Sequence, residues 1–215
     1  MKYINKGAEP EVLSQYKARA NDEWEPTFKD LPGEKKRKLH RQLVDEQGWL
    51  CCYCLARVKE EDSHIEHLHP QSKSPERLAL DYGNMLVSCQ RDLPPKEPRH
   101  CGTLKEDWYE KKLMVSPLQE DCEKRFRFTA YGNVFPAIAD DRAARTTIRK
   151  LGLDIDRLRA LRRGAIDGAL DGIDDLSSGE IRKLAAGFLQ RDSRGKFPEC
   201  CVAVAHVLRG LAEPQ

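Results

Sequence analysis

One short segment of the chain carries the residues best suited to chemistry. It reads His64-Ile65-Glu66-His67-Leu68-His69-Pro70 and places three imidazoles and one carboxylate within six residues. Side chains alternate along a β-strand, so we expect His64 and Glu66 to share one face and His67 and His69 the other. Neighbours of opposite orientation can flank a substrate, one holding a metal ion and the next handling a proton. Exposed polar residues on a loop are the alternative interpretation.

Eight cysteines surround and follow this segment. Without a secretion signal, metal binding is favoured over a disulfide framework. Cys51 and Cys54 have the spacing of a zinc knuckle, and a stiff, proline-rich loop between Cys89 and Cys101 is expected to bring that pair to the same ion. Four thiolates predict a structural zinc site with no open position, and buried or unpaired thiols are the alternative.

The other four cysteines lie outside this quartet. Cys52 is adjacent to a ligand and is expected to point elsewhere. Cys122, Cys200 and Cys201 are interpreted as core or interface thiols, with a second metal as the alternative.

Helices and short strands must position these groups. Helices are expected over 11–20 and 34–47, the second with Leu39, Leu43 and Val44 inward, and its Lys35–Lys38 run is interpreted as a solvated face. A zinc turn between short strands is expected at 49–58, a strand at 64–68, an apolar segment at 85–87 and a helix from Cys101 to about Lys112. The rest predicts a hairpin over 126–135 and four helices, which begin at caps Asp140 and Asp154 and at 178 and 198.

Composition excludes several protein classes. The 215 residues are 40% hydrophobic and 33% charged, and no segment approaches the ~20 apolar residues of a membrane helix. A cytoplasmic protein with no membrane partner is expected. The net charge of +2 is uneven, because 142–163 hold eight Lys or Arg and two acids, a local charge of +6. We expect four of these arginines to contact nucleic acid or a partner protein, and a solvated helix face is the alternative: Arg157, Arg159, Arg162 and Arg163.

The motif pattern resembles a known nuclease family. The sequence Cys51-x-x-Cys54, Ile65-Glu66-His67-x-x-Pro70, Asn84 to Cys89, then His100-Cys101-Gly102 and Lys105 is similar to HNH nucleases with a cysteine-bound zinc. More narrowly, it resembles the PtuB-like HNH proteins of Septu anti-phage systems and of retron-associated defence modules. The resemblance implies an α+β, mainly helical fold. It comprises an N-terminal helical segment (1–48), a zinc-stapled ββα-metal core (49–112) and a hairpin with a helical tail (113–215).

The resemblance also implies roles for single residues. His67 matches the general base, Asn84 matches the asparagine that ties the loop and orients that base, and Glu66 matches a ligand of Mg²⁺ or Mn²⁺. The family often has His or Asn directly after the last cysteine, where this chain has Gly102 and Thr103. The candidates for the missing catalytic-metal ligand are His100, ranked first, then Asp107 and Asp92, with His64 as a contributor from the Glu66 face.

Two functions follow as hypotheses. The first is a metal-dependent endonuclease, acting on DNA or alternatively RNA, as effector of an anti-phage defence complex. The second is a zinc-scaffolded binding module without cleavage. The resemblance implies a PtuA-like ABC/SMC-type ATPase as partner, with a retron reverse transcriptase and its RNA–DNA product as further candidates. The chain itself has no G-x-x-x-x-G-K-[ST] nucleotide motif.

Overall fold

The computed structural model describes residues 1–73, 75–92 and 96–213. Its helices are α1 (Glu11–Lys17), α2 (Gly33–Glu46), α3 (Glu76–Ala79), α4 (Cys101–Lys105), α5 (Arg142–Lys150), α6 (Asp156–Leu170), α7 (Ser178–Phe188) and α8 (Cys201–Leu211). Its strands are β1 (Ser63–His67), β2 (Met85–Cys89), β3 (Phe126–Phe128) and β4 (Val134–Pro136), and short 3₁₀ turns cover Gln71–Lys73, Tyr82–Asn84 and Cys122–Arg125. No helix in these ranges is long and apolar enough to span a membrane.

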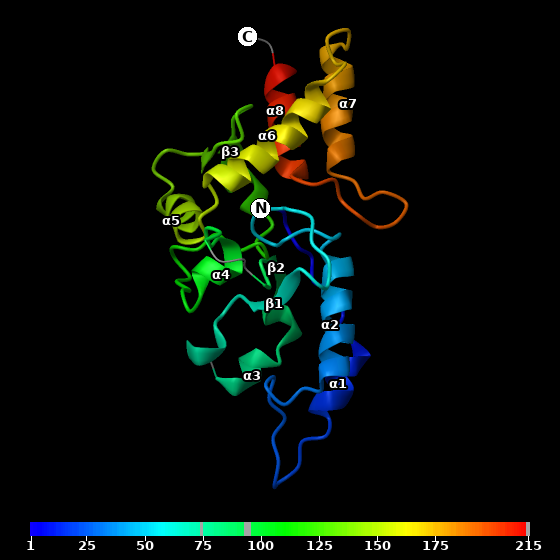
Figure 1. The fold of residues 1–215 in the computed structure, drawn as a ribbon, viewed down its shortest axis with the longest axis vertical. Coiled ribbons are helices and arrows are strands. Elements are labelled where there is room, and N and C mark those ends of the chain that lie inside the picture. The colour runs from blue at the N-terminus through cyan, green and yellow to red at the C-terminus, as the bar shows by residue number, and fades with distance from the viewer. Residues whose placement is uncertain (74, 93–95, 214–215) are drawn as a thin grey trace.

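A two-stranded antiparallel sheet lies at the centre of the molecule (Figure 1). β1 pairs with β2 so that Glu66 lies opposite Leu86 and His67 opposite Met85. Helix α2 packs against both strands and α4 packs against β2. The predicted inward residues of α2, Leu39, Leu43 and Val44, are fully buried. Every residue of β2 is buried, so this small sheet is held in the core and positions the site residues on β1.

The C-terminal part forms a second packed layer. Helices α6, α7 and α8 lie together at one end of the molecule, opposite α1 and α2 (Figure 1). They bury an apolar cluster that includes Ile166, Ala185 and Leu208. Helix α7 begins with a capping box, because Ser177 and Glu180 satisfy each other's backbone N–H groups. The mixture of helices and small sheets agrees with the α+β, mainly helical class.

The hairpin of β3 and β4 joins this helical layer to the centre. Its turn uses Gly132 with a positive φ of 81°, and a Cβ there would lie 2.1 Å from the carbonyl oxygen of Arg159 on α6. Only glycine allows the turn and the helix backbone to approach this closely. The hairpin expected at 126–135 is therefore confirmed, and it is fixed against α6.

Several expected boundaries are wrong. The helix after Cys101 ends at Lys105 instead of Lys112, because Glu106 adopts a positive φ of 47° that stops the helix. Asp141, not Asp140, caps α5, and its carboxylate accepts a hydrogen bond from the Ala144 backbone. Asp154 does not cap α6; its carboxylate instead accepts from the Val134 backbone. Residues 49–58 form a turn closed by one isolated bridge, Leu50 to Arg57, rather than short strands.

Candidate active site and metal centre

Four cysteines from three segments converge on one point. The Sγ atoms of Cys51, Cys54, Cys89 and Cys101 all lie within 4.8 Å of one another. Zinc bound tetrahedrally at about 2.3 Å from each sulfur requires sulfur–sulfur separations of about 3.8 Å. Cys54 and Cys89 are separated by 3.8 Å. The donor set and its size therefore fit a structural metal such as zinc.

Hydrogen bonds to the sulfurs support this fit. The backbone N–H groups of Ala56 and Cys89 donate to Cys54 Sγ and Cys51 Sγ, both at 3.5 Å. Burial would raise the pKa of the Cys51 thiol, but the neighbouring thiols hydrogen-bond to it and hold its pKa well below the usual value. Burial raises the pKa of Cys101 well above the usual value. In so crowded a cluster, the negative charge of one thiolate disfavours ionisation of the others. A divalent cation would neutralise the thiolates and let all four lose their protons.

The structure places His100 beside this cysteine cluster. Its Nδ1 lies 3.2 Å from Cys101 Sγ and 3.7 Å from Cys89 Sγ. Within the ranges that the structure describes, no hydrogen bond or ion pair joins His100 to Glu66. Cys52 lies outside the quartet, and its backbone N–H donates to Val87 on β2.

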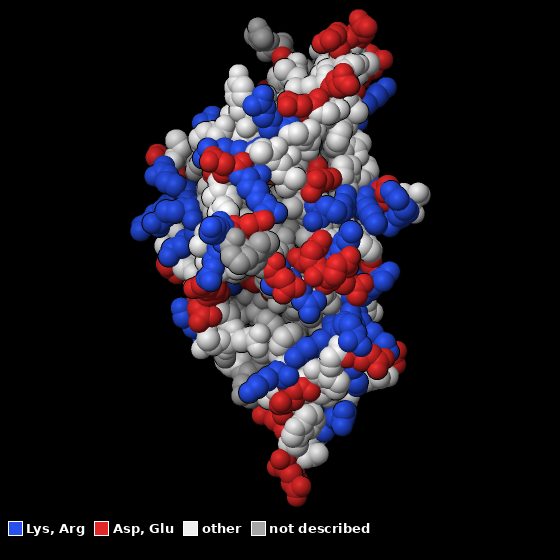
Figure 2. Space-filling model, in the orientation of Figure 1, with Lys and Arg blue, Asp and Glu red and all other residues white. Residues whose placement is uncertain are grey.

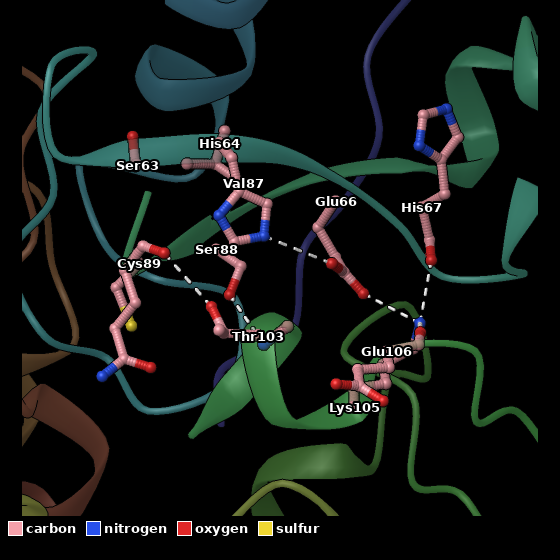
Figure 3. A network of polar contacts seen from close by, with 12 residues as sticks. Ser63, His64, Glu66, His67, Val87, Ser88, Cys89, Thr103, Lys105 and Glu106 are labelled. Atoms are coloured by element: carbon pink, nitrogen blue, oxygen red, sulfur yellow. Dashed lines mark hydrogen bonds and ion pairs between the residues drawn. The ribbon is translucent and has the colours of Figure 1, made fainter. Parts of the chain in front are cut away.

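Glu66 is the centre of a second polar cluster (Figure 3). Its Oε2 lies 3.5 Å from His64 Nε2, and its Oε1 accepts from Lys105 Nζ at 2.9 Å and from the Tyr53 hydroxyl at 3.1 Å. Both Glu66 and Lys105 are buried. Burial would raise the pKa of Glu66, but His64 and Lys105 outweigh it and hold the pKa below the usual value. The carboxylate is therefore ionised and fixed in direction.

Gly102 on α4 borders this cluster at the position where the resembling family often has His or Asn. A Cβ at residue 102 would lie 2.5 Å from Glu66 Oε2, 2.8 Å from His64 Nε2 and 3.0 Å from Ser88 Oγ. The imidazole of His64 thus occupies, from β1, the space that a side chain on α4 would need. Of the four candidates for the missing ligand, only His64 contacts Glu66 in the described residues.

His67 lies on the other side of β1, as strand alternation predicts (Figure 3). Its Nε2 lies 3.0 Å from the carbonyl oxygen of Ala79, which can only accept, so Nε2 carries the proton. Nδ1 therefore keeps its lone pair, and the exposed side chain of Gln71 lies 3.1 Å from it. Burial lowers the pKa of His67, although Ala79 and Glu66 oppose the shift. A neutral imidazole whose unprotonated Nδ1 accepts only from the exposed Gln71 amide can accept a proton there once Gln71 moves away.

Asn84 fastens the loop that leaves β1. Its side chain accepts from the His69 backbone N–H at 2.7 Å and donates to the carbonyls of His69 and Leu78. Leu78 belongs to α3, next to Ala79, whose carbonyl holds the His67 ring. The position of Asn84 is therefore suited to positioning His67 through the backbone.

The four arginines expected to contact nucleic acid or a partner differ in burial and in the groups that they contact. Arg162 is 3% exposed, and its Nε donates to the carbonyl of Gly132 in the hairpin turn. It cannot reach a phosphate or a partner surface without leaving the core, which disfavours Arg162 as a contact residue. Arg157, Arg159 and Arg163 each pair with a carboxylate, from Glu97, Asp154 and Asp167 respectively. On the face drawn in Figure 2, Lys and Arg side chains gather over α5.

The sequence analysis assigned no role to two groups that hold Glu66, although it included Lys105 in the motif. Tyr53 lies between the two cysteines of the knuckle, and Lys105 lies four residues after Cys101 on α4. A residue at i+4 faces the same side of a helix, so the position of Lys105 relative to a metal ligand was the available signal. Through these two side chains the cysteine cluster positions the Glu66 carboxylate.

Comparison with known proteins finds two similar sequences. No family model matches the chain. It is 29% identical over 144 residues to a Vibrio cholerae serotype O1 biovar El Tor protein named "Retron Vc95 putative HNH endonuclease", covering 64% of this chain and 67% of that protein. It is 31% identical over 96 residues to the Escherichia coli protein named "Retron Ec83 putative HNH endonuclease", covering 41% of this chain and 37% of that protein. Both relatives are named as HNH endonucleases, the class whose motif pattern the sequence resembles.

Proposed function

We propose that this chain is a metal-dependent HNH endonuclease that hydrolyses phosphodiester bonds. The observation that carries the proposal is the contact between His64 and Glu66 beside Gly102. The next residue of the same strand after Glu66 is the buried His67. A binding module needs no oriented carboxylate next to an imidazole whose proton is fixed on one nitrogen.

The donor atoms suit a divalent cation. Two ligands on neighbouring positions of an octahedral ion, each at about 2.1 Å, lie about 3 Å apart. His64 Nε2 and Glu66 Oε2 are 3.5 Å apart, so a small movement would let both bind one ion. Mg²⁺ and Mn²⁺ accept a few protein ligands and fill the remaining positions with water and phosphate oxygens. Such an ion would supply positive charge beside the scissile phosphate and its leaving oxygen.

The protein's own groups have separate tasks in this proposal. His67 accepts, at Nδ1, a proton from the attacking water, while the Ala79 carbonyl keeps the ring in the required tautomer. Gln71 is exposed and can give up Nδ1 to that water. Lys105 and Tyr53 hold one oxygen of Glu66 and leave the other directed at His64. Asn84 keeps the loop that carries the Ala79 contact in place.

The finer assignment rests on resemblance and on the names of the relatives. We assign the chain to a PtuB-like, retron-associated defence complex, with DNA as the expected substrate and RNA as the alternative. A PtuA-like ATPase would be its partner, with a retron reverse transcriptase and its RNA–DNA product as further candidates. The retron in both relatives' names supports this context.

Cleavage assays test the proposal. Purified protein, alone and with a PtuA-like ATPase, is incubated with plasmid DNA and with RNA, with Mg²⁺, with Mn²⁺ or with no added divalent ion. Cleavage that requires the ion is expected, and His67→Ala should lose about 10²–10⁴-fold in rate with unchanged zinc content. His206→Ala, which removes an exposed histidine on α8, is the matched control and should cleave normally. Wild-type rates in His67→Ala would exclude its role as base, and an inert wild-type protein under all conditions would favour the binding module.

A further inference from the structure

A groove runs between α2 and the edge of β1. Within the described ranges β1 pairs with a strand on one edge only, so its other edge is open to this groove. We call it the α2 groove, and the residues that line it come from the loop before α2, from α2, from β1 and from the segment after β2: Phe28, Gly33, Lys36, Arg37, His40, Ser63, His64, Ile65 and Arg91.

The charge of this groove has one sign. Among the described residues that line it, three carry cationic side chains, Lys36, Arg37 and Arg91, and none carries a carboxylate. None of the three forms an ion pair with a carboxylate among the residues that the structure describes. The cavity on the other side of Arg91 is different, since Asp62, Glu97 and Glu199 line it. Figure 2 shows Lys and Arg side chains gathered over α2 on the face drawn there.

Electrostatics inside the groove agree with its composition. His40 is buried beneath it and hydrogen-bonds to Ser63 at 3.0 Å. Burial, reinforced by Arg91 and His64, lowers the pKa of His40 to about 4. A neutral histidine next to unpaired cations leaves the groove positive at neutral pH, which suits an anionic ligand.

The groove contacts both halves of the candidate active site. His64 lines it and lies 3.5 Å from Glu66. Phe28 also lines it, and its ring packs edge-on against the ring of His67 with centroids 4.6 Å apart. Glu66 and His67 face opposite sides of β1. A ligand lying along the open edge of the strand would therefore lie between His64, which contacts Glu66, and Phe28, which contacts His67.

We infer that the α2 groove binds the phosphodiester backbone of the nucleic-acid substrate and leads it along the open edge of β1 to the site. This inference rests on the proposed function and assigns the substrate's path. Lys36, Arg37 and Arg91 contact phosphates without reading sequence. Phe28, which is half-buried and has Lys36 5.1 Å above its ring, offers a stacking surface at the end nearest His67. The basic run of α2 then acts as a binding surface rather than only as a solvated face.

Binding measured without cleavage tests this path separately from the nuclease activity. The variant Lys36→Gln, Arg37→Gln, Arg91→Gln is compared with wild type for binding of a labelled DNA duplex and a labelled RNA, with no divalent ion added. The matched control removes three exposed charges on and between α7 and α8, as Lys183→Gln, Arg194→Gln, Arg209→Gln. Circular dichroism confirms that all three proteins are folded.

Three phosphate contacts contribute about 0.9 each to the salt dependence of duplex binding. The groove variant should therefore lower the slope of log K against log salt by about 3 and weaken binding on the order of 100-fold near 0.15 M salt. The control should keep both values. Wild-type affinity in the groove variant, equal weakening in the control, or loss of only a protein partner's binding would each overturn the inference. If the wild type never cleaves but the groove variant alone loses binding, the nuclease proposal fails while the groove assignment stands.

Discussion

Replacing Gly102 by alanine tests the arrangement around Glu66 most directly. The added methyl carbon would lie 2.5 Å from Glu66 Oε2 and 2.8 Å from His64 Nε2. To reach an ordinary contact of 3.4 Å, the carboxylate oxygen must retreat by about 0.9 Å. It cannot do so freely, because Lys105 and Tyr53 hold the other oxygen of the same carboxylate. The carboxylate is therefore expected to shift under strain, and His64, which is partly exposed, to swing away from the methyl group.

The expected result is a large loss of activity with a small change in stability. A displacement of about 1 Å in a catalytic group can cost on the order of 100-fold in rate. Alanine favours a helix over glycine by about 1 kcal/mol, and overpacking costs about 1–3 kcal/mol, so the free energy of unfolding should fall by no more than about 2 kcal/mol. The zinc content should not change, since the methyl group points toward Glu66 and Ser88.

Cleavage rate against Mn²⁺ concentration is the assay, with thermal unfolding and elemental analysis on the same samples. Gly164→Ala is the matched control, because a Cβ at that helical position of α6 meets nothing within 4 Å. It should keep full activity and gain up to about 1 kcal/mol in stability. Gly102→Ala cleaving at the wild-type rate with the same Mn²⁺ dependence would refute the assignment of His64 and Glu66 as joint ligands.

Three further predictions concern the zinc centre and the supporting structure. Purified protein should contain one zinc ion per chain, and its removal by a strong chelator should unfold the core, because such a site supplies on the order of 10 kcal/mol; elemental analysis and circular dichroism check this. Asp141→Ala should cost about 1–2 kcal/mol, since Asp141 caps α5 and pairs with Arg125. The Arg125 hydrogen bond holds the pKa of Asp141 below its usual value, so denaturant titrations should show this difference constant above about pH 5 and shrinking as pH falls toward and through the lower pKa of the folded state. Arg162→Ala should destabilise by about 2 kcal/mol and Arg163→Ala by less than about 0.5 kcal/mol, and equal midpoint shifts in urea would contradict the burial argument.

Local patterns in the sequence predicted the parts of the site that depend on local geometry. Strand alternation correctly predicts that His64 and Glu66 face one side of β1 and His67 the other. The spacing of the cysteines predicts the cluster, because zinc ligands must meet within a few ångströms. The hairpin at Gly132 follows from its turn residues in the same way.

The remaining contacts depend on how distant segments pack. Lys105 reaches Glu66 only because α4 crosses the sheet at that point. His100 was ranked first as the catalytic-metal ligand, but the turn into α4 directs its ring to the sulfurs. In the sequence, Arg162 has no feature that separates it from the other arginines of its basic helix. It is buried because Gly132 approaches α6 closely. Only Lys105 had a signal in the sequence, its spacing of four residues from Cys101, and the outcomes for His100 and Arg162 depend on tertiary packing.

The buried ion pair between Lys105 and Glu66 has a thermodynamic consequence. Lys105 is 3% exposed and cannot turn into solvent, so its charge largely cancels that of the carboxylate. In the proposed function, a divalent ion that binds alone must therefore enter a nearly neutral pocket and leave it strongly positive. A phosphate group relieves that excess, so each of the two ligands should raise the affinity of the other by the same factor. The weak occupancy of the cation in the free protein would then keep the hydrolytic centre incomplete until a nucleic acid arrives to complete it.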